Sequence, residues 1–157
     1  MPIEKVKEFF AAHGMENRIR EFEVSSATVA LAADALGCEP ARIAKTMSFK
    51  GKDDYILVVA AGDVKVDNAK FKQTFGVKAT MLRFEEVESA IGHAVGGVCP
   101  FAVNEGVSVY LDQSLKRFKT VFPACGSSNS AIELTIPELE LYATPIAWVD
   151  VFKFIET

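Results

Sequence analysis

The chain has 157 residues, half of them hydrophobic, and a formal net charge of −4 at neutral pH. This length and composition can bury one hydrophobic core without metals or disulfides, so we expect residues 1–157 to form a single domain. The longest uninterrupted apolar run, from Tyr55 to Ala61, is far shorter than the roughly 20 residues that cross a bilayer, which excludes a membrane-spanning helix.

The N-terminal segment MPIEKVKEFF carries charges where a secretory signal needs an apolar stretch, so we expect a soluble, cytoplasmic protein. Its cysteines, Cys38, Cys99 and Cys125, are odd in number and have no CxxC spacing, which suits reduced thiols. A zinc site would have to complete a nearby pair, His93 and Cys99, with ligands from distant segments. We therefore expect neither a metal site nor a cofactor.

The first elements predicted are helical. Apolar residues recur at helical spacing from residue 3 to residue 13, and Gly14 is a typical residue after a helix. Ser26 or Thr28 can cap a second helix that Gly37 ends. Pro40 suits the first turn of a short third helix.

A strand hairpin is predicted next. From Lys45 to Lys50 the pattern alternates and places Lys45, Met47 and Phe49 on one face. The turn GKDD joins this strand to Tyr55–Ala61, whose continuous apolar run is typical of a central strand covered on both faces.

The remaining pattern predicts helices and strands in alternation. Asp67 can cap a helix that ends at Gly76, and another helix ends at Gly92. The helix that ends at Gly92 spans 85–91. The other expected elements are strands over 107–111, 120–124, 131–134 and 147–154 and a helical turn from Pro137. The last strand would place Trp148, Asp150 and Phe152 on one face. This order predicts an α+β (mixed α/β) fold, a mixed sheet flanked by helices.

Lys45 is the first candidate functional residue, because an amine on an apolar strand face loses hydration and requires compensation. The alternative is a lysine whose stem packs while its amine reaches water.

The second candidate is IGHAVGGVCPF, from Ile91 to Phe101. Gly96 and Gly97 lack side chains, so consecutive main-chain N–H groups can turn toward an anion or a developing oxyanion, and Pro100 stiffens the loop. The alternative is an ordinary turn.

His93 and Cys99 could also form a base and a nucleophile. No third residue is available to orient the imidazole, and Cys99 is more typical of a small buried hydrophobic residue.

The loop CGSSNS, from Cys125 to Ser130, offers hydroxyl and amide groups to a polar ligand, or simply makes a turn.

The charges are unevenly distributed. Between Lys45 and Arg83 the chain has eight basic and four acidic residues, and a second basic cluster follows at residues 116, 117 and 119. This pattern fits either a nucleic-acid surface or a solvated face.

Several of these stretches together resemble the YbaK and prolyl-tRNA-synthetase editing-domain family over almost the whole chain. The segment AKTMSFK, from Ala44, resembles the family strand with its functional lysine, and GGVCP, from Gly96, is similar to the family's GxxxP loop. Related sequence also occurs at Gly92 and His93, in VYLDQSL with Asp112, and in GSSNSAIEL from Gly126.

The resemblance implies a barrel-like mixed sheet and a freestanding trans-editing hydrolase that deacylates misacylated tRNA, typically a mischarged prolyl-tRNA. It implies that Lys45 holds the 3′-terminal adenosine region or its phosphate and that Gly96 and Gly97 bind the ester carbonyl. A ribose hydroxyl of the substrate would assist the reaction. The further substrate contacts implied are Thr46, His93, Pro100, Asp112, Cys125, Gly126, Ser127 and Asn129.

The implied partners are the 3′ acceptor end of an aminoacyl-tRNA and prolyl-tRNA synthetase, with no membrane and no DNA. One departure concerns specificity, because several relatives that remove alanine carry a histidine where this chain has FPACG, Phe122 to Gly126. Two other functions remain open: a non-catalytic module that binds a tRNA end or a synthetase, and a small-molecule hydrolase or nucleotide-binding protein.

Overall fold

The computed structural model describes residues 2–155. The helices and helical turns are α1 (Pro2–Ala11), η1 (Glu16–Arg18), α2 (Val29–Leu36), η2 (Pro40–Arg42), α3 (Asn68–Phe75), α4 (Phe84–Ile91), η3 (Gln113–Arg117) and α5 (Ile136–Ala143). The strands are β1 (Ile19–Glu21), β2 (Ile43–Lys50), β3 (Tyr55–Ala61), β4 (Val64–Val66), β5 (Val107–Asp112), β6 (Thr120–Pro123), β7 (Ser130–Ile132), β8 (Leu134–Thr135), β9 (Ala147–Val149) and β10 (Phe152–Phe154).

A six-stranded mixed sheet forms the centre of the fold, in the order β8-β6-β2-β3-β5-β9, and it curls into half a barrel. β2 and β3 are antiparallel, whereas β6 beside β2 and β5 beside β3 run parallel to their neighbours. Two small antiparallel pairs, β1 with β7 and β4 with β10, lie outside this sheet. The α+β fold with a barrel-like sheet, expected from the sequence, is confirmed.

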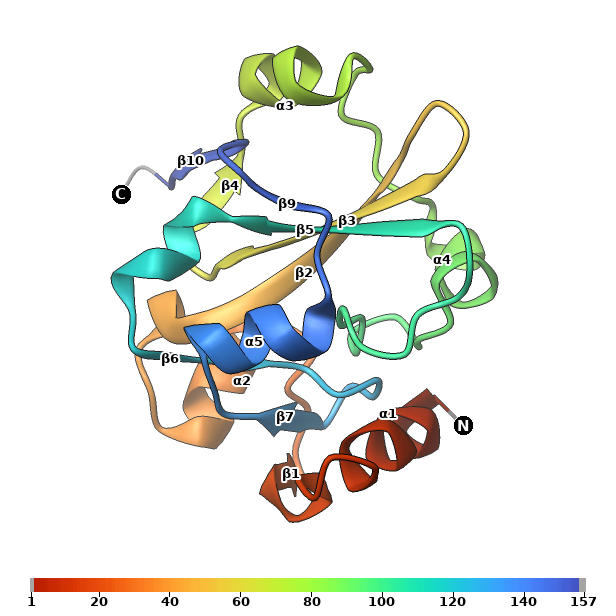
Figure 1. Ribbon diagram of the computed structural model, residues 1–157. Helices are drawn as coiled ribbons and strands as arrows, with labels where there is room; N and C mark the ends of the chain where they lie inside the picture. The colour runs from red at the N-terminus through yellow and green to blue at the C-terminus, as the bar shows by residue number, and fades with distance from the viewer. Residues whose placement is uncertain (1, 156–157) are drawn as a thin grey trace.

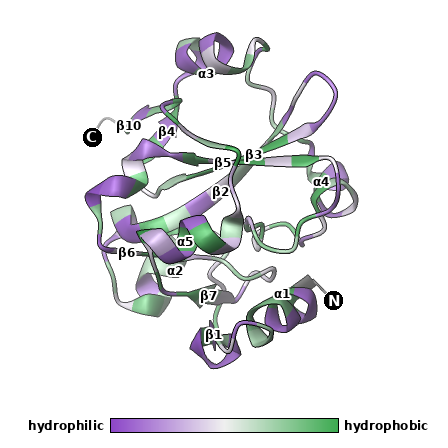
Figure 2. Cartoon of the chain, viewed as in Figure 1, coloured by the Kyte–Doolittle hydropathy of each residue, from purple (hydrophilic) through white to green (hydrophobic). Residues whose placement is uncertain are grey.

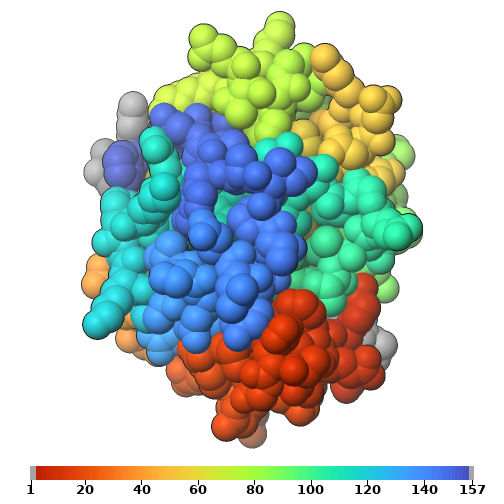
Figure 3. Space-filling view, in the orientation of Figure 1, coloured from red at the N-terminus to blue at the C-terminus, as the bar shows by residue number. Residues whose placement is uncertain are grey.

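Two hydrophobic clusters cover the two faces of β3. Leu57 and Val59 belong to a large cluster that also includes residues of α1, α4 and α5, while Val58 and Ala60 belong to a second cluster with Phe71 of α3. Figure 1 shows α3 beside β4 and β10 at one end of the molecule and α1 at the other, and the space-filling view in Figure 3 shows the C-terminal part between them. Figure 2 shows hydrophilic residues along α3 and the β2–β3 loop. β3 is therefore the doubly covered central strand that its apolar run predicts.

The predicted helix ends are confirmed by their capping groups. Thr28 accepts a hydrogen bond from the N–H of Leu31, and Asp67 accepts from Ala69 and Lys70. Of the four glycines predicted to follow a helix, Gly37, Gly76 and Gly92 adopt the left-handed conformation that ends it. Gly14 also has a positive φ, but α1 ends earlier, at Ala11.

The prediction of one long last strand is wrong. The chain leaves the sheet at Val151, whose N–H donates to Asp112 Oδ1 at 3.0 Å and whose carbonyl accepts from the N–H of Asp67 at 2.8 Å. β9 therefore pairs with β5, and β10 pairs with β4. Trp148 packs on the large cluster and Phe152 lies in the second, so the two side chains do not share a face.

The structure also corrects the predictions for two shorter elements. The expected strand over 131–134 is divided between β7, which pairs with β1, and β8, which pairs with β6. The helical turn expected from Pro137 is a full helix, α5, because Thr135 and Glu138 form a capping box that stabilises its first turn.

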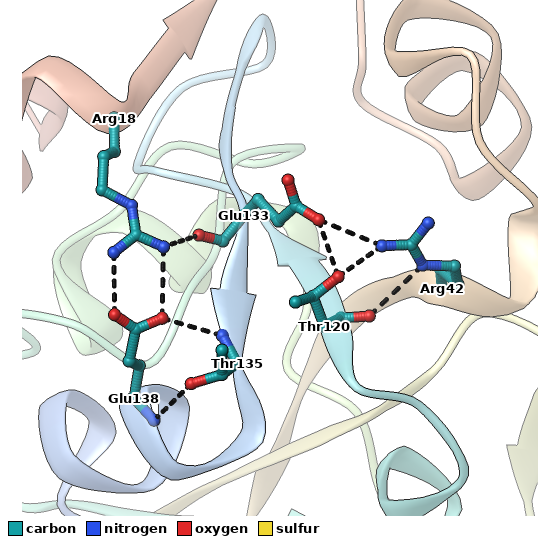
Figure 4. Close-up of polar contacts among 6 residues, drawn as sticks. All are labelled: Arg18, Arg42, Thr120, Glu133, Thr135 and Glu138. Atoms are coloured by element: carbon teal, nitrogen blue, oxygen red, sulfur yellow. Dashed lines mark hydrogen bonds and ion pairs between the residues drawn. The ribbon is translucent and has the colours of Figure 1, made fainter.

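A network of six side chains, here called the arginine network, joins segments distant in sequence at the β6–β8 edge (Figure 4). Arg18 pairs with both carboxylate oxygens of Glu138, at 2.7 and 3.1 Å, and donates to the carbonyl of Glu133 at 2.6 Å. Arg42 pairs with Glu133 at 3.1 Å. The network consists of Arg18, Arg42, Thr120, Glu133, Thr135 and Glu138. It connects η1 and η2 to β6, β8 and α5.

Candidate active site

The candidate site is a gap beside the middle of β2. On that side of the strand, β6 pairs with Ile43 and Ala44, and the segment 80–82 bonds further along, with Leu82 N–H donating to Ser48 O at 3.2 Å and Lys50 N–H to Thr80 O at 2.8 Å. Main-chain groups alternate in direction along a strand, so Thr46 directs its N–H and C=O to this same side, between the two partners. The gap therefore presents unusually accessible main-chain groups.

A pocket of about 460 Å³ opens at this gap. Its walls come from residues 26–29 before and within α2, from residues 81–87 around the start of α4, from the glycine loop at Gly96, and from β6 and β7. Most of the lining side chains are apolar, which is typical of ligand pockets that place a few polar groups within hydrophobic walls.

Lys45 lines the pocket and is half-buried. Its Nζ donates to the carbonyl of Val64, and within residues 2–155 this is its one hydrogen bond, although an ammonium has three donors. Burial lowers the pKa of Lys45, and the nearby carboxylate of Asp63 partly opposes this. That carboxylate is itself held by Arg117 at 2.6 Å. Lys45 shares its strand face with Phe49, as the alternation predicts, and its ammonium retains donors for a ligand.

Thr46 also lines the pocket, from the other face of β2. Its hydroxyl Oγ1 is buried and has no hydrogen-bond partner among the described residues. Buried polar atoms in folded proteins are nearly always paired, so an unpaired hydroxyl in a pocket wall is available to a ligand.

The two glycines of the loop have different positions. Gly96 lines the pocket with φ +87°, and a Cβ there would lie 2.9 Å from Cβ of Ala27. Gly97 lies behind the loop: its N–H donates to Ala94 O at 3.0 Å, and its carbonyl accepts from Gly126 at 2.9 Å. A Cβ on Gly97 would lie 2.3 Å from the main-chain nitrogen of Ser127. The two N–H groups therefore do not both point into the pocket, and Gly97 permits close packing of two loops.

The loop after Cys125 supports the pocket from behind. Asn129 Nδ2 donates to Phe22 O at 2.9 Å, and Ser26 N–H donates to Ser128 O at 2.7 Å. The Ser127 hydroxyl donates to Asn129 Oδ1 at 3.0 Å. Ser127 and Asn129 thus position the segment 22–28, while Gly126 bonds to Gly97. All three lie outside the pocket lining, which instead includes Ser130.

His93 and Cys99 are fully buried and do not line the pocket. His93 Nε2 lies 2.7 Å from the carbonyl of Phe101, so this nitrogen carries the proton and donates. The thiol of Cys99 lies 3.5 Å from the same nitrogen, which has no lone pair left to accept a proton. Burial raises the pKa of Cys99 to about 12. This arrangement lacks the thiolate that a nucleophilic cysteine requires.

Three other predicted contacts are buried away from the pocket. Asp112 is 1% exposed and accepts from the N–H groups of Ser114 and Val151, both at 3.0 Å, so its carboxylate caps η3 and anchors the chain between β9 and β10. Pro100 and Cys125 are also buried and do not line the pocket. The structure brings together Lys45, Thr46 and Gly96 from the sequence-based set.

Several lining residues were not singled out from the sequence, notably Ala27, Met81 and Phe84. Met81 and Phe84 are large apolar residues that precede the helix predicted over 85–91, and the structure starts this helix at Phe84. The one signal in the sequence was their position just before this helix, where a large apolar side chain is not required for the helix to pack.

Part of the predicted basic surface is already paired. Lys50 and Arg83 both approach Glu86, at 3.5 and 3.2 Å, and Lys70 pairs with Asp150 at 3.0 Å.

No helix within residues 2–155 has both the length and the apolar character needed to span a membrane. The same residues contain no group of three or more side chains suited to bind a metal.

Comparison with known proteins identifies the family. The sequence pattern of the aminoacyl-tRNA editing domain matches residues 23–141, which include every residue that lines the pocket. The chain belongs to the aminoacyl-tRNA editing domain family. This editing domain is 54% identical over 98% of both chains to the uncharacterized protein YwhH of Bacillus subtilis.

Other relatives are larger or known by structure. The proline–tRNA ligase of Bacillus cytotoxicus is 32% identical over 60% of this chain, and the matched part is 16% of that ligase. The crystal structure of a proposed trans-editing enzyme for prolyl tRNA synthetase superposes with a TM-score of 0.86 at 26% identity, over 97% of each chain. The protein APE2540 superposes with a TM-score of 0.84 at 29% identity, over 95% of this chain and 99% of that one.

Proposed function

We propose that this editing domain hydrolyses the ester of a misacylated tRNA, in the cytoplasm and as a protein separate from the synthetase. The observation that carries the proposal is the gap beside β2, where Lys45, the free groups of Thr46 and the Gly96 loop meet in one pocket. The likeness to proline–tRNA ligases makes a mischarged prolyl-tRNA the first substrate to test and prolyl-tRNA synthetase the first partner.

An aminoacyl ester is already activated, so its hydrolysis needs a positioned water and a stabilised oxyanion more than a protein nucleophile. In the proposed complex, the amino-acid side chain occupies the apolar pocket and the ester carbonyl lies against the Gly96 loop. Lys45 uses its remaining donors on the terminal nucleotide, and a hydroxyl of the substrate's ribose assists the attacking water. Gly97 acts by allowing the two loops to pack, and His93, Cys125 and Asp112 support the fold around the site.

The test is release of labelled amino acid from a panel of mischarged tRNAs, beginning with the proline-specific tRNA charged with alanine, cysteine or serine. We expect release above the uncatalysed rate for at least one member, and loss of that release in Lys45→Met. Tight binding of the same tRNAs without release would favour a non-catalytic binding module. Hydrolysis of small esters but of no charged tRNA would favour a small-molecule hydrolase.

A further inference from the structure

Three exposed apolar side chains gather at the mouth of the pocket. Phe84 is 76% exposed, Met81 is 52% exposed and Val95 is 40% exposed, and all three line the pocket. We call these three residues the apolar rim. An apolar group at a binding site is informative because exposure of large apolar side chains in one place marks a contact surface.

Phe84 is not required for the packing of its helix. It is the first residue of α4 and continues the stripe of Val87 and Ile91, which are 7% and 0% exposed. One helical turn separates Phe84 from Val87, so its ring extends this stripe past the core to the pocket mouth. The helix is anchored by the two buried residues, which leaves the Phe84 ring free to contact a ligand.

The rim is held in place by the sheet. Met81 forms a bridge with Phe49 of β2, and the residues on either side of it bond to Lys50 and Ser48. The surface is thus built on a fixed strand edge, next to the gap that exposes Thr46.

Charges of both signs surround the rim. The side chains of Arg83 and Lys50 are 69% and 45% exposed, and Glu86 lies within 3.5 Å of both. Glu85 and Glu86 in the first turn of α4 balance these two cations, so the rim carries no net positive charge and offers a ligand mainly apolar and aromatic contact. Proteins that bind single-stranded nucleic acids stack the bases on exposed aromatic side chains, and Phe84 offers such a surface.

We propose that the apolar rim, with Phe84 as its main surface, stacks the unpaired 3′-terminal nucleobase of the tRNA. This rests on the proposed function, because the esterified ribose then occupies the pocket and the base attached to the same ribose must leave through the mouth. Stacking tolerates any base, so the rim selects for an unpaired end rather than for its sequence.

The test is a binding cycle with two RNA hairpins, both acceptor-stem mimics with a single-stranded CCA end, one of which has an abasic terminal nucleotide. We expect Phe84→Ala to weaken binding of the intact hairpin about tenfold or more, the usual range for loss of one stacked base. The wild-type protein should bind the abasic hairpin more weakly than the intact one by a similar factor. Phe84→Ala should weaken binding of the abasic hairpin little further. Phe84→Trp should restore binding of the intact hairpin.

The matched control is Phe154→Ala, since Phe154 is 61% exposed and lines a different pocket, away from the rim. It should leave hairpin binding unchanged, and neither variant should move the thermal midpoint appreciably. The proposal is overturned by equal binding of both hairpins by the wild type, or by an equal effect of Phe84→Ala on the binding of both. A wild-type dimer that Phe84→Ala dissociates would assign the rim to a second copy of the chain and also overturn it.

Deacylation separates this proposal from the proposed function. If the binding cycle shows coupling between Phe84 and the terminal base but no ester is hydrolysed, the apolar rim still binds the base and the proposed hydrolase activity is rejected. Normal hydrolysis with an unchanged KM in Phe84→Ala would support the hydrolase and reject the stacking of the terminal base on the apolar rim.

Discussion

The arginine network and the mostly apolar pocket each contain polar groups, and these groups are paired to opposite extents. In the arginine network each charged side chain has several partners: Glu138 accepts from Arg18 and from the main chain of Thr135, and Glu133 accepts from Arg42 and Thr120. At the pocket, Lys45 has one protein partner and the Thr46 hydroxyl has none among the described residues. The first region joins elements, and the second keeps binding capacity for a ligand.

The difference teaches how to separate structural from functional polar residues in this fold. A polar group whose hydrogen bonds are complete stabilises the protein, so its loss lowers stability and leaves activity intact. A polar group that stays unpaired in a pocket costs stability, so its removal lowers activity without unfolding the protein.

The largest effect is expected for Lys45→Met. Loss of one electrostatic contact in a site with little water commonly lowers the rate about a hundredfold or more. Because burial lowers the pKa of Lys45, the folded state disfavours its charged form, so the wild type gains stability as pH rises from the lowered pKa toward 10.5. The variant should lack this gain and should match or exceed the wild-type thermal midpoint at neutral pH.

The measurements are deacylation and thermal unfolding of the same sample, with the exposed Lys65→Met as control. Unchanged deacylation together with a lower midpoint would show that Lys45 is a structural residue.

Gly97→Ala should have the next largest effect, on both activity and stability. The added Cβ would lie 2.3 Å from the main-chain nitrogen of Ser127, so one of the two loops must move. Forced overpacking of this kind typically costs about 1–3 kcal/mol, and movement of Gly96 should lower deacylation as well. Urea unfolding measures the first effect. Gly97 is not among the glycines with a positive φ, so its variant reports the clash; Gly14→Ala, with a positive φ and no atom within 4 Å of its added Cβ, shows the cost of backbone strain alone. Unchanged stability of Gly97→Ala would exclude a loop clash.

A smaller effect is expected for Thr46→Val, which removes the unpaired hydroxyl and nearly preserves volume. Activity should fall by up to about tenfold, the value of one neutral hydrogen bond to the substrate, while stability stays the same or rises. Thr46→Ser should recover most of the activity because it restores the hydroxyl. Kinetics of the two variants side by side test this, and full activity in Thr46→Val would remove the hydroxyl from the mechanism.

The smallest effect belongs to the arginine network. Arg18, with the main chain and hydroxyl of Thr135, holds the pKa of Glu138 at about 2, below its ordinary 4.5. The carboxylate therefore contributes stability that is complete above about pH 4.5 and is lost as pH falls toward 2. Arg18→Met should lower the midpoint at neutral pH by a few degrees, as expected for a partly exposed pair, and flatten the loss of stability in acid. Deacylation should not change, and a large activity loss in this variant would contradict the division between the two regions.

Local chemistry was sufficient to predict much of the fold. Helix ends depend on single residues close in sequence, so Thr28, Asp67 and the glycines at 37, 76 and 92 could be identified directly. Alternation likewise placed Lys45 on the same face as Phe49, because successive side chains of a strand point to opposite faces of the sheet. The break at Val151 could not be predicted, since it depends on Asp112 and Asp67, which are distant in the chain.

The site shows the same division. The sequence by itself determined that Lys45 lies on an apolar strand face and that Gly96 and Gly97 form a loop without side chains. Tertiary structure alone decided that β6 and the segment 80–82 stop short of Thr46, that Gly96 lines the pocket while Gly97 packs against Ser127, and that Asp112 is a buried cap. The physical reason is that side-chain periodicity is a local property, whereas an unpaired strand edge exists only where neighbouring segments, set by the whole sheet, fail to meet.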